Sequence, residues 1–241
     1  MKITTAFLSE EGDRDYNEDC IGIVSDGASC MLAVADGLGG HGKGEIASQT
    51  AVQAVKDVYS VRSENLIGSM IQEAQDRVIR LQEEANDSFS MKTTLVTAVV
   101  SGGQLEWGHI GDSRLYIFQG KKLIQRTLDH SVPQMLVNSG EIREKDIRGH
   151  ADRNKLLRVI GIEWESPRYQ LGGPYMLNED TQLLLCSDGF WENIDEKHML
   201  KLLRKSSSPE SWLSSMKEEV MQNGRNKNMD NFSAVCAFVE V

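Results

Sequence analysis

Two apolar, strand-like runs in this chain end in an aspartate that is followed at once by glycine. Asp36 closes the run 31–35, and Asp188 closes the run 183–187. A carboxylate at the end of a strand is held by a rigid element, and the glycine after it leaves room for a small group beside the acid. Two such acids far apart in the sequence predict a site assembled by the fold, with a hard divalent cation as its occupant.

Other acidic residues recur at predicted strand ends and turns, namely Glu18, Asp19, Asp112 and Asp230. If the fold brings these acids together, their like charges cannot all stay ionised without cations. Carboxylates suit Mg²⁺ or Mn²⁺, and the lack of nearby Cys and His clusters argues against zinc. Two ions that share a bridging carboxylate can activate a water and clamp a phosphoryl oxygen. Each acid alone is an ordinary turn residue, so the prediction rests on the set.

The composition narrows the possible classes of protein. The chain has 241 residues, of which 40% are hydrophobic, and this is enough to build one large domain around a real core. The formal net charge of -10 argues against nucleic acid or an anionic membrane as a partner. We find no secretory signal and no apolar run of membrane-spanning length, and we therefore expect a cytoplasmic protein.

The elements that must position these acids follow from the hydrophobic periodicity. Two helices are predicted, with apolar faces over 47–58 and 67–85, and two more are predicted over 195–204 and from Ser208 onward. Strands are predicted at 4–8, 21–25, 31–35, 93–101, 105–110, 114–119, 122–126, 169–171, 181–186 and 232–239. The four middle strands resemble a meander, and tight turns between consecutive strands predict antiparallel sheets that carry helices. Residues 131–160 are charged and weakly helical, and contain no predicted strand.

One motif points to a different class of enzyme. Residues Gly37 to Lys43 have the G-x-x-x-x-G-K spacing of a phosphate-binding loop, between a predicted strand and a predicted helix. However, Gly44 stands where such a loop needs Ser or Thr to ligate magnesium. A P-loop ATPase also needs a parallel sheet, and the predicted hairpins oppose one. A P-loop ATPase is therefore a weaker interpretation than the divalent-cation site.

The ordered set of motifs carries a resemblance to a known family. In chain order they are Arg14-Asp15-Tyr16-Asn17-Glu18-Asp19, Asp36-Gly37-Leu38-Gly39-Gly40-His41, Gly111-Asp112-Ser113-Arg114, Asp129-His130-Ser131, Leu156 to Gly161, Ser187-Asp188-Gly189 and Asp230-Asn231. This order resembles the PP2C (PPM) family of metal-dependent protein Ser/Thr phosphatases, and most of all its compact bacterial members. The likeness runs from about Arg14 to the C-terminus.

The resemblance implies an α+β fold in which a central sandwich of two antiparallel β-sheets is flanked by α-helices on both sides. It implies one catalytic domain over residues 1–241, with a flap at about 131–154. Two Mn²⁺ or Mg²⁺ ions, with a third as an option, and in-line attack by a metal-bridging water on phosphoserine or phosphothreonine are implied as well. Its partners would be proteins phosphorylated by a Ser/Thr kinase, and the chain would be a monomer.

The resemblance also assigns metal-binding roles to five residues. Asp36 would bridge the two ions, and Gly37 would offer its backbone carbonyl to one of them. Asp188 and Asp230 would ligate the other ion, with Glu18 in its shell through water.

Further roles are implied around this pair of ions. Asp112, together with Asp188, is assigned to a third and weaker ion. Arg14 would bind the substrate phosphate, for which a guanidinium fork is geometrically suited. Asn231 and Asp19 would hold the metal ligands in place without binding the ions themselves.

Two departures from the family pattern limit this assignment. Many eukaryotic members carry histidine two residues after the bridging aspartate, where this chain has Leu38. His41 lies three residues later, and either a general-acid role or a place at the start of a helix fits it. The usual Gly-Thr-Thr is Lys92-Thr93-Thr94 here, which bears on local backbone geometry. A catalytically silent binding module is the remaining alternative; it would be marked by a lost ligand, and all the matched ligands are present.

Overall fold

The computed structural model describes residues 1–39, 43–61, 65–87, 90–120 and 122–241. His41 and Lys121 lie outside these ranges. One sheet has five strands in the order β1, β11, β10, β7 and β8, and every neighbouring pair in it is antiparallel. Their bounds are Lys2–Glu10, Phe232–Glu240, Thr181–Cys186, Arg114–Gln119 and Lys122–Arg126.

The second sheet follows the order β2, β3, β5, β6 and β9, again with antiparallel neighbours, and β4 pairs with β3. Their bounds are Asp19–Ser25, Cys30–Leu38, Leu95–Ser101, Gln104–Ile110, Gln170–Met176 and Lys92–Thr93. The predicted single meander is therefore wrong, because the chain changes sheets between β6 and β7. The change occurs at Gly111, whose φ of 102° lies in the left-handed region that glycine favours.

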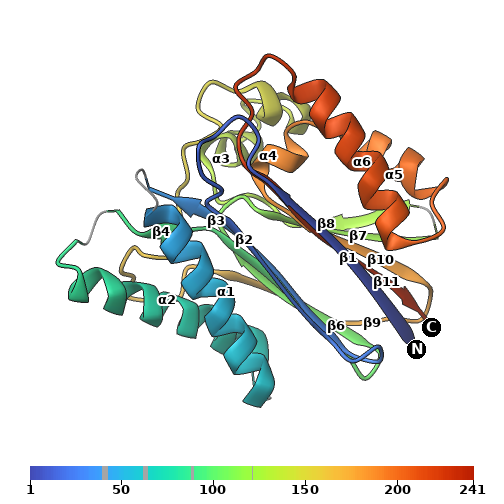
Figure 1. Cartoon of the computed structure of the whole chain (residues 1–241), viewed down its shortest axis with the longest axis horizontal. Coiled ribbons are helices and arrows are strands. Elements are labelled where there is room, and N and C mark those ends of the chain that lie inside the picture. The colour runs from blue at the N-terminus through green and yellow to red at the C-terminus, as the bar shows by residue number, and fades with distance from the viewer. Residues whose placement is uncertain (40–42, 62–64, 88–89, 121) are drawn as a thin grey trace.

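Helices cover the outer faces of both sheets, as Figure 1 shows. The helices α1 (Lys43–Val61) and α2 (Leu66–Glu84) lie on the second sheet, and α5 (Glu196–Leu203) and α6 (Pro209–Gly224) lie on the first. Ser208 caps α6 and accepts a hydrogen bond from the Ser211 amide, with Pro209 at the first helical position, as predicted. The α+β sandwich of two antiparallel sheets is confirmed.

The alternation of side chains along the central strands builds three hydrophobic layers. In β3, Leu32 and Val34 face the gap between the sheets, whereas Met31 and Ala33 face α1 and α2. Both sets are fully buried because a strand with packed layers on both faces has no solvent side. The same period of two directs Asp36, two residues after Val34, toward the gap between the sheets at the end of β3.

The segment after β8 contains short helices and no strand, as predicted. It holds α3 (Val132–Asn138) and the 3₁₀ helix η1 (Glu144–Gly149), and Ser131 caps α3. The strand β9 was predicted too short, because Gly172, Gly173 and Pro174 are poor strand formers and hid its second half. Within the described ranges, no helix is both long and apolar enough to cross a membrane.

Candidate active site

Carboxylates from both sheets meet at one end of the sandwich. Asp19 in β2 lies directly across from Asp36 in β3 in the strand register, so their side chains share one face. Asp188 begins the short helix α4 (Asp188–Trp191), and Asp112 lies in the turn between β6 and β7. Burial raises the pKa of Asp36 well above its ordinary value, and the charges of Asp188, Asp19, Asp112 and Asp230 raise it further. The fold therefore brings the predicted acids into one electrostatic cluster.

The backbone of Asp36 is held by the segment that departs from the family pattern. The Thr94 amide and the Thr93 hydroxyl both donate to the Asp36 carbonyl, each over 2.9 Å. In return, the Asp36 amide donates to Thr94 Oγ1 over 3.0 Å, and this hydroxyl lies 2.7 Å from the Ser113 hydroxyl. The two threonines thus connect the end of β3 to the turn that carries Asp112.

Gly37 and Gly44 pack backbone against backbone beside Glu18. A Cβ atom on Gly37 would lie 2.3 Å from the Gly44 carbonyl oxygen, and one on Gly44 would lie 2.9 Å from Glu18 Oε1. Both positions therefore exclude any larger side chain. The Ser or Thr that a P-loop needs after Lys43 does not fit here, and β3 runs antiparallel to both neighbours. The P-loop alternative is excluded.

Two carboxylate oxygens at this end of the sandwich have no hydrogen-bond donor among the residues that the structure describes. These oxygens are the buried atoms Glu18 Oε1 and Asp19 Oδ1. Burial raises the pKa of Glu18 and brings that of Asp19 to about 7. Buried carboxylate oxygens without a hydrogen-bond donor, in a cluster of acids, are ligands that a hard divalent cation binds. The residues therefore fit Mn²⁺ or Mg²⁺. No three such side chains, within the described residues, surround one point closely enough to hold an ion as they stand.

Arg14 and Asp230 form a bidentate ion pair. Arg14 Nε and Nη2 donate to the two carboxylate oxygens of Asp230, each over 2.9 Å. This pairing raises the pKa of Arg14. The sequence predicted separate roles for the two residues, phosphate binding for Arg14 and metal binding for Asp230. The structure joins them, and it leaves the Nη1 group of Arg14 without a protein hydrogen bond among the described residues.

Asn231 joins the N-terminal loop to the start of β11. Its Oδ1 accepts from the Glu18 amide over 2.8 Å. Its Nδ2 donates to the carbonyls of Glu11 and Tyr16 over 2.8 Å and 2.9 Å. The side chain therefore fixes the loop that carries both Arg14 and Glu18, which is a supporting position and not a direct one.

Gly189 allows a close approach between two segments of the chain. It lies inside α4, and a Cβ atom there would lie 2.1 Å from the carbonyl oxygen of Asn231. Glycine thus permits α4 to approach the start of β11, which brings Asp188 near Asp230. Burial raises the pKa of Asp188 to about 6, and the charge of Asp230 adds to this effect.

A pocket of about 100 Å³ opens beside these acids. The predicted flap contributes Arg153 and Asn154, and the rest of the lining comes from Arg14, Asp188, Gly189, Glu192, Asn193, Lys227, Asn228, Met229 and Asp230. Arg153 Nε donates to Glu192 over 3.1 Å, and burial near Asp188 raises the pKa of Glu192 to about 7. Sequence reasoning missed Glu192, although its spacing of four residues after Asp188 would place both on one helical face.

The motifs around residues 111–131 form a buried support beneath the pocket. Arg114 donates to Asp129 through Nε and Nη2 over 2.8 Å and 2.6 Å, and both side chains are buried. His130 Nδ1 accepts from the Gly111 amide over 3.2 Å, and burial lowers its pKa to about 3. His130 therefore stays neutral and orients the backbone next to Asp112.

Comparisons with known proteins agree with this architecture. The family model described as protein phosphatase 2C matches residues 9–232. The serine/threonine phosphatase stp of Listeria welshimeri is 34% identical over 204 residues, which cover 81% of this chain and 80% of that protein. The structure of the serine/threonine phosphatase Stp1 from Staphylococcus aureus has a TM-score of 0.87 at 27% identity, over 100% of this chain and 96% of that one.

A further solved structure is that of the catalytic domain of the phosphatase PstP in complex with two manganese ions. It has a TM-score of 0.83 at 26% identity, over 100% of this chain and 99% of that one. The sequence match and the shared sandwich both extend over most of this chain. The chain belongs to the protein phosphatase 2C family.

Proposed function

We propose that this chain is a metal-dependent protein phosphatase that hydrolyses phosphoserine and phosphothreonine. The observation that carries the proposal is the acid cluster with its orphaned buried oxygens, next to the pocket lined by Arg14. The relatives in the comparison are serine/threonine phosphatases, and one of them was solved with two manganese ions. We assign the whole of residues 1–241 to one catalytic domain, with 131–154 as its flap.

The residues of the acid cluster have different roles in the proposed metal site. The metal ligands are Asp36, Gly37 through its carbonyl, Asp188, Asp230, Glu18 through water, and Asp112 for a third ion. When bound, Mn²⁺ or Mg²⁺ supplies a water nucleophile at neutral pH and neutralises phosphoryl charge.

Arg14 binds the substrate phosphate through the part of its fork that Asp230 does not use, and its pairing with Asp230 orients that fork. Asn231 fixes the loop that carries Arg14. Asp19 accepts from the Ser187 hydroxyl over 2.7 Å and lies across from Asp36 in the strand register, so we assign it a supporting role beside the bridging acid.

An activity assay tests the proposal directly. The purified chain should hydrolyse a generic aryl phosphate and a phosphothreonine peptide with Mn²⁺, and should lose both activities in EDTA. Asp36→Asn should abolish turnover, whereas Asp76→Asn, an isosteric change on the exposed face of α2, should not alter it. Mn²⁺ binding without turnover would identify a catalytically silent binding module. Hydrolysis confined to ATP would contradict the proposal.

We further propose that the chain acts in the cytoplasm, as a monomer, on proteins that a Ser/Thr kinase has phosphorylated. Three hydrophobic layers within one chain support independent folding without a partner subunit. Sedimentation should give a single species near 26.9 kDa, and a dimer would refute the monomer proposal. Phosphoproteomics of a deletion strain should reveal accumulated phosphoserine and phosphothreonine sites in cytoplasmic proteins.

A further inference from the structure

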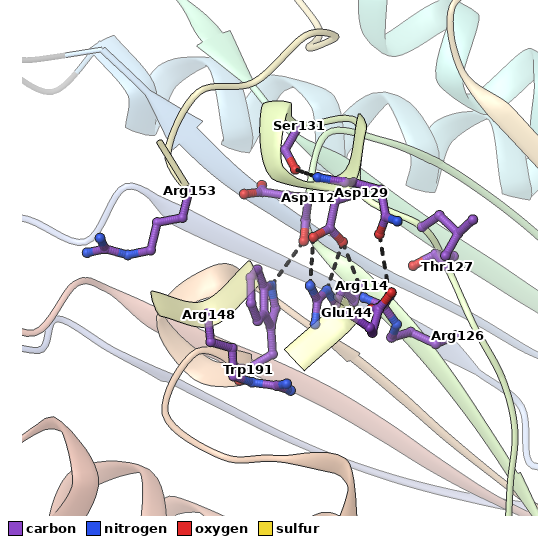
Figure 2. Close-up of polar contacts among 12 residues, drawn as sticks. Asp112, Arg114, Arg126, Thr127, Asp129, Ser131, Glu144, Arg148, Arg153 and Trp191 are labelled. Carbon is purple, nitrogen blue, oxygen red and sulfur yellow. Dashed lines mark hydrogen bonds and ion pairs between the residues drawn. The ribbon is translucent and has the colours of Figure 1, made fainter. Parts of the chain in front are cut away.

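A buried arginine and a buried tryptophan are stacked beneath the acid cluster. Arg114 in β7 is 1% exposed, and its guanidinium carbon lies 3.4 Å from the ring centroid of Trp191. Asp129 pairs with this guanidinium, so the buried charge is neutralised. Figure 2 shows the indole beside Arg114, with the Asp112 turn above it. The buried, ion-paired guanidinium of Arg114 thus holds the ring of Trp191 in one orientation.

Trp191 connects two of the turns that carry the acids. Its indole Nε1 donates to the backbone carbonyl of Asp112 over 3.0 Å. Its own backbone completes α4, the single helical turn that begins at Asp188. Asp112 and Asp188 are 76 positions apart in the sequence. This side chain therefore links the Asp112 turn to the Asp188 helix, in addition to the pairing of Arg114 with Cys186 in the adjoining strands.

The flap is attached to the same helix. Arg148 in η1 donates through Nε to the Trp191 carbonyl over 3.0 Å and through Nη2 to Glu196 over 2.8 Å. Its Nη2 also lies 3.4 Å from the Ile194 carbonyl. Arg148 is therefore a clamp between the flap and the end of α4, and a shorter cation could not reach all three acceptors.

We propose that Trp191 is a positioning residue that holds the Asp112 turn against the Asp188 helix, and that Arg148 ties the flap to this same unit. This inference rests on the proposed function, because Asp112 and Asp188 matter as metal ligands. The acids and the flap would then move as one body. Neither Trp191 nor Arg148 is required to touch the metal or the substrate.

A second buried tryptophan makes the test specific. Trp212 in α6 is also fully buried, and its Nε1 donates to a backbone carbonyl, that of Met199, over the same 3.0 Å. Trp212 packs in the layer between the first sheet and its helices. Replacing either tryptophan with phenylalanine removes an indole N–H that donates to a backbone carbonyl, that of Asp112 in a turn or that of Met199 in α5. A purely structural role would make the two variants equivalent.

The experiment compares Trp191→Phe with Trp212→Phe. Trp191→Phe should weaken Mn²⁺ binding, measured by calorimetry, by about tenfold to a hundredfold, as the loss of a supporting partner does. In the metal-free protein it should also speed amide hydrogen exchange in residues 111–113. Trp212→Phe should change neither quantity. Equal effects of the two variants on Mn²⁺ affinity, or no effect of Trp191→Phe, would overturn the inference.

A second pair of variants tests the flap and does not depend on Trp191→Phe folding. Arg148→Lys should speed exchange in residues 144–149 and raise KM for a phosphopeptide several-fold, with kcat for a small aryl phosphate unchanged. Arg143→Lys is the matched control, since the exposed Arg143 caps the same 3₁₀ helix and, within the described residues, forms an ion pair only with the nearby Asp146. Identical behaviour of both arginine variants would overturn the inference.

The two proposals fail in different ways. A wild-type chain without Mn²⁺-dependent turnover would refute the proposed function. The exchange rates of residues 111–113 and the Mn²⁺ affinities would still decide the role of Trp191, since neither measurement requires catalysis.

Discussion

The ionised carboxylate of Asp188 destabilises the metal-free protein, and replacing Asp188 with asparagine should remove this effect. Burial and the charge of Asp230 raise the pKa of Asp188 from 3.8 to about 6. A carboxyl whose pKa rises on folding binds its proton more tightly in the folded state than in the unfolded state. Its stabilising contribution is therefore fully present below pH 3.8, and is lost as the pH rises through about 6.

The expected size of this effect follows from the pKa difference. A rise of about two units corresponds to about 3 kcal/mol of lost stability at pH 8, and to about half of that at pH 5. Asp188 is only partly buried, so solvent screens part of the effect, and we expect about 1–3 kcal/mol. Asp188→Asn should therefore raise the Tm of the metal-free protein at pH 8 by about 2–12 °C.

The same substitution should act in the opposite direction on catalysis. Asparagine lacks the charge that a metal ligand supplies here, so turnover with Mn²⁺ should fall at least about a hundredfold. Mn²⁺ should raise the Tm of the wild type but not that of Asp188→Asn. Thermal unfolding at pH 5 and pH 8, in EDTA and in Mn²⁺, measures all of these quantities alongside the aryl phosphate assay. Asp76→Asn is the control.

Two results would refute this reasoning. If Asp188→Asn were less stable than the wild type in EDTA at pH 8, charge crowding would not be the dominant effect at this position. If the variant kept wild-type turnover, Asp188 would not be a metal ligand.

Three further predictions concern neighbouring residues. Arg14→Ala should raise KM for phosphopeptides by about tenfold to a hundredfold, through loss of a charged hydrogen bond, whereas Arg143→Ala should not; an unchanged KM would place the phosphate elsewhere. Asn231→Ala removes the side-chain partner of the Glu18 amide and of the Tyr16 carbonyl, and leaves the Glu11 carbonyl with only the Arg14 amide; it should cost about 2–4 kcal/mol in urea denaturation, and a cost near zero would contradict its supporting role. Mn²⁺ affinity should rise between pH 5 and pH 8, by up to about tenfold per pH unit for each proton released, because Asp188 and Asp19 have pKa values of about 6 and about 7; a flat calorimetric profile would refute this.

The regular helices and strands were predictable because the spacing of apolar residues along the chain shows which side chains are buried. The alternation in β3 and the apolar faces of α1 and α2 follow directly from which residues must leave water. The short helix α4 was missed because its four residues are too few to show a period. The division of the middle strands between two sheets was missed because a hairpin and a crossover at Gly111 have similar local sequences.

For the candidate site, the residue types were predictable and their pairings were not. Strand-end acids and the Arg14 motif were visible in the sequence, as was the likeness to the phosphatase family. The ion pair between Arg14 and Asp230 joins residues 216 positions apart, so no local pattern could reveal it. The partners of Glu192 and Trp191 were hidden for the same reason.

By itself, the sequence determined which residues carry charge, which must be buried, and which family their order matches. Only the tertiary structure decided that Asp19 lies across from Asp36, that Gly189 lets α4 approach Asn231, and that Trp191 reaches the Asp112 turn. The physical reason is that hydrophobic periodicity depends on near neighbours along the chain. Contacts between distant segments depend instead on how two sheets and their helices pack, and that packing is set by the whole chain at once.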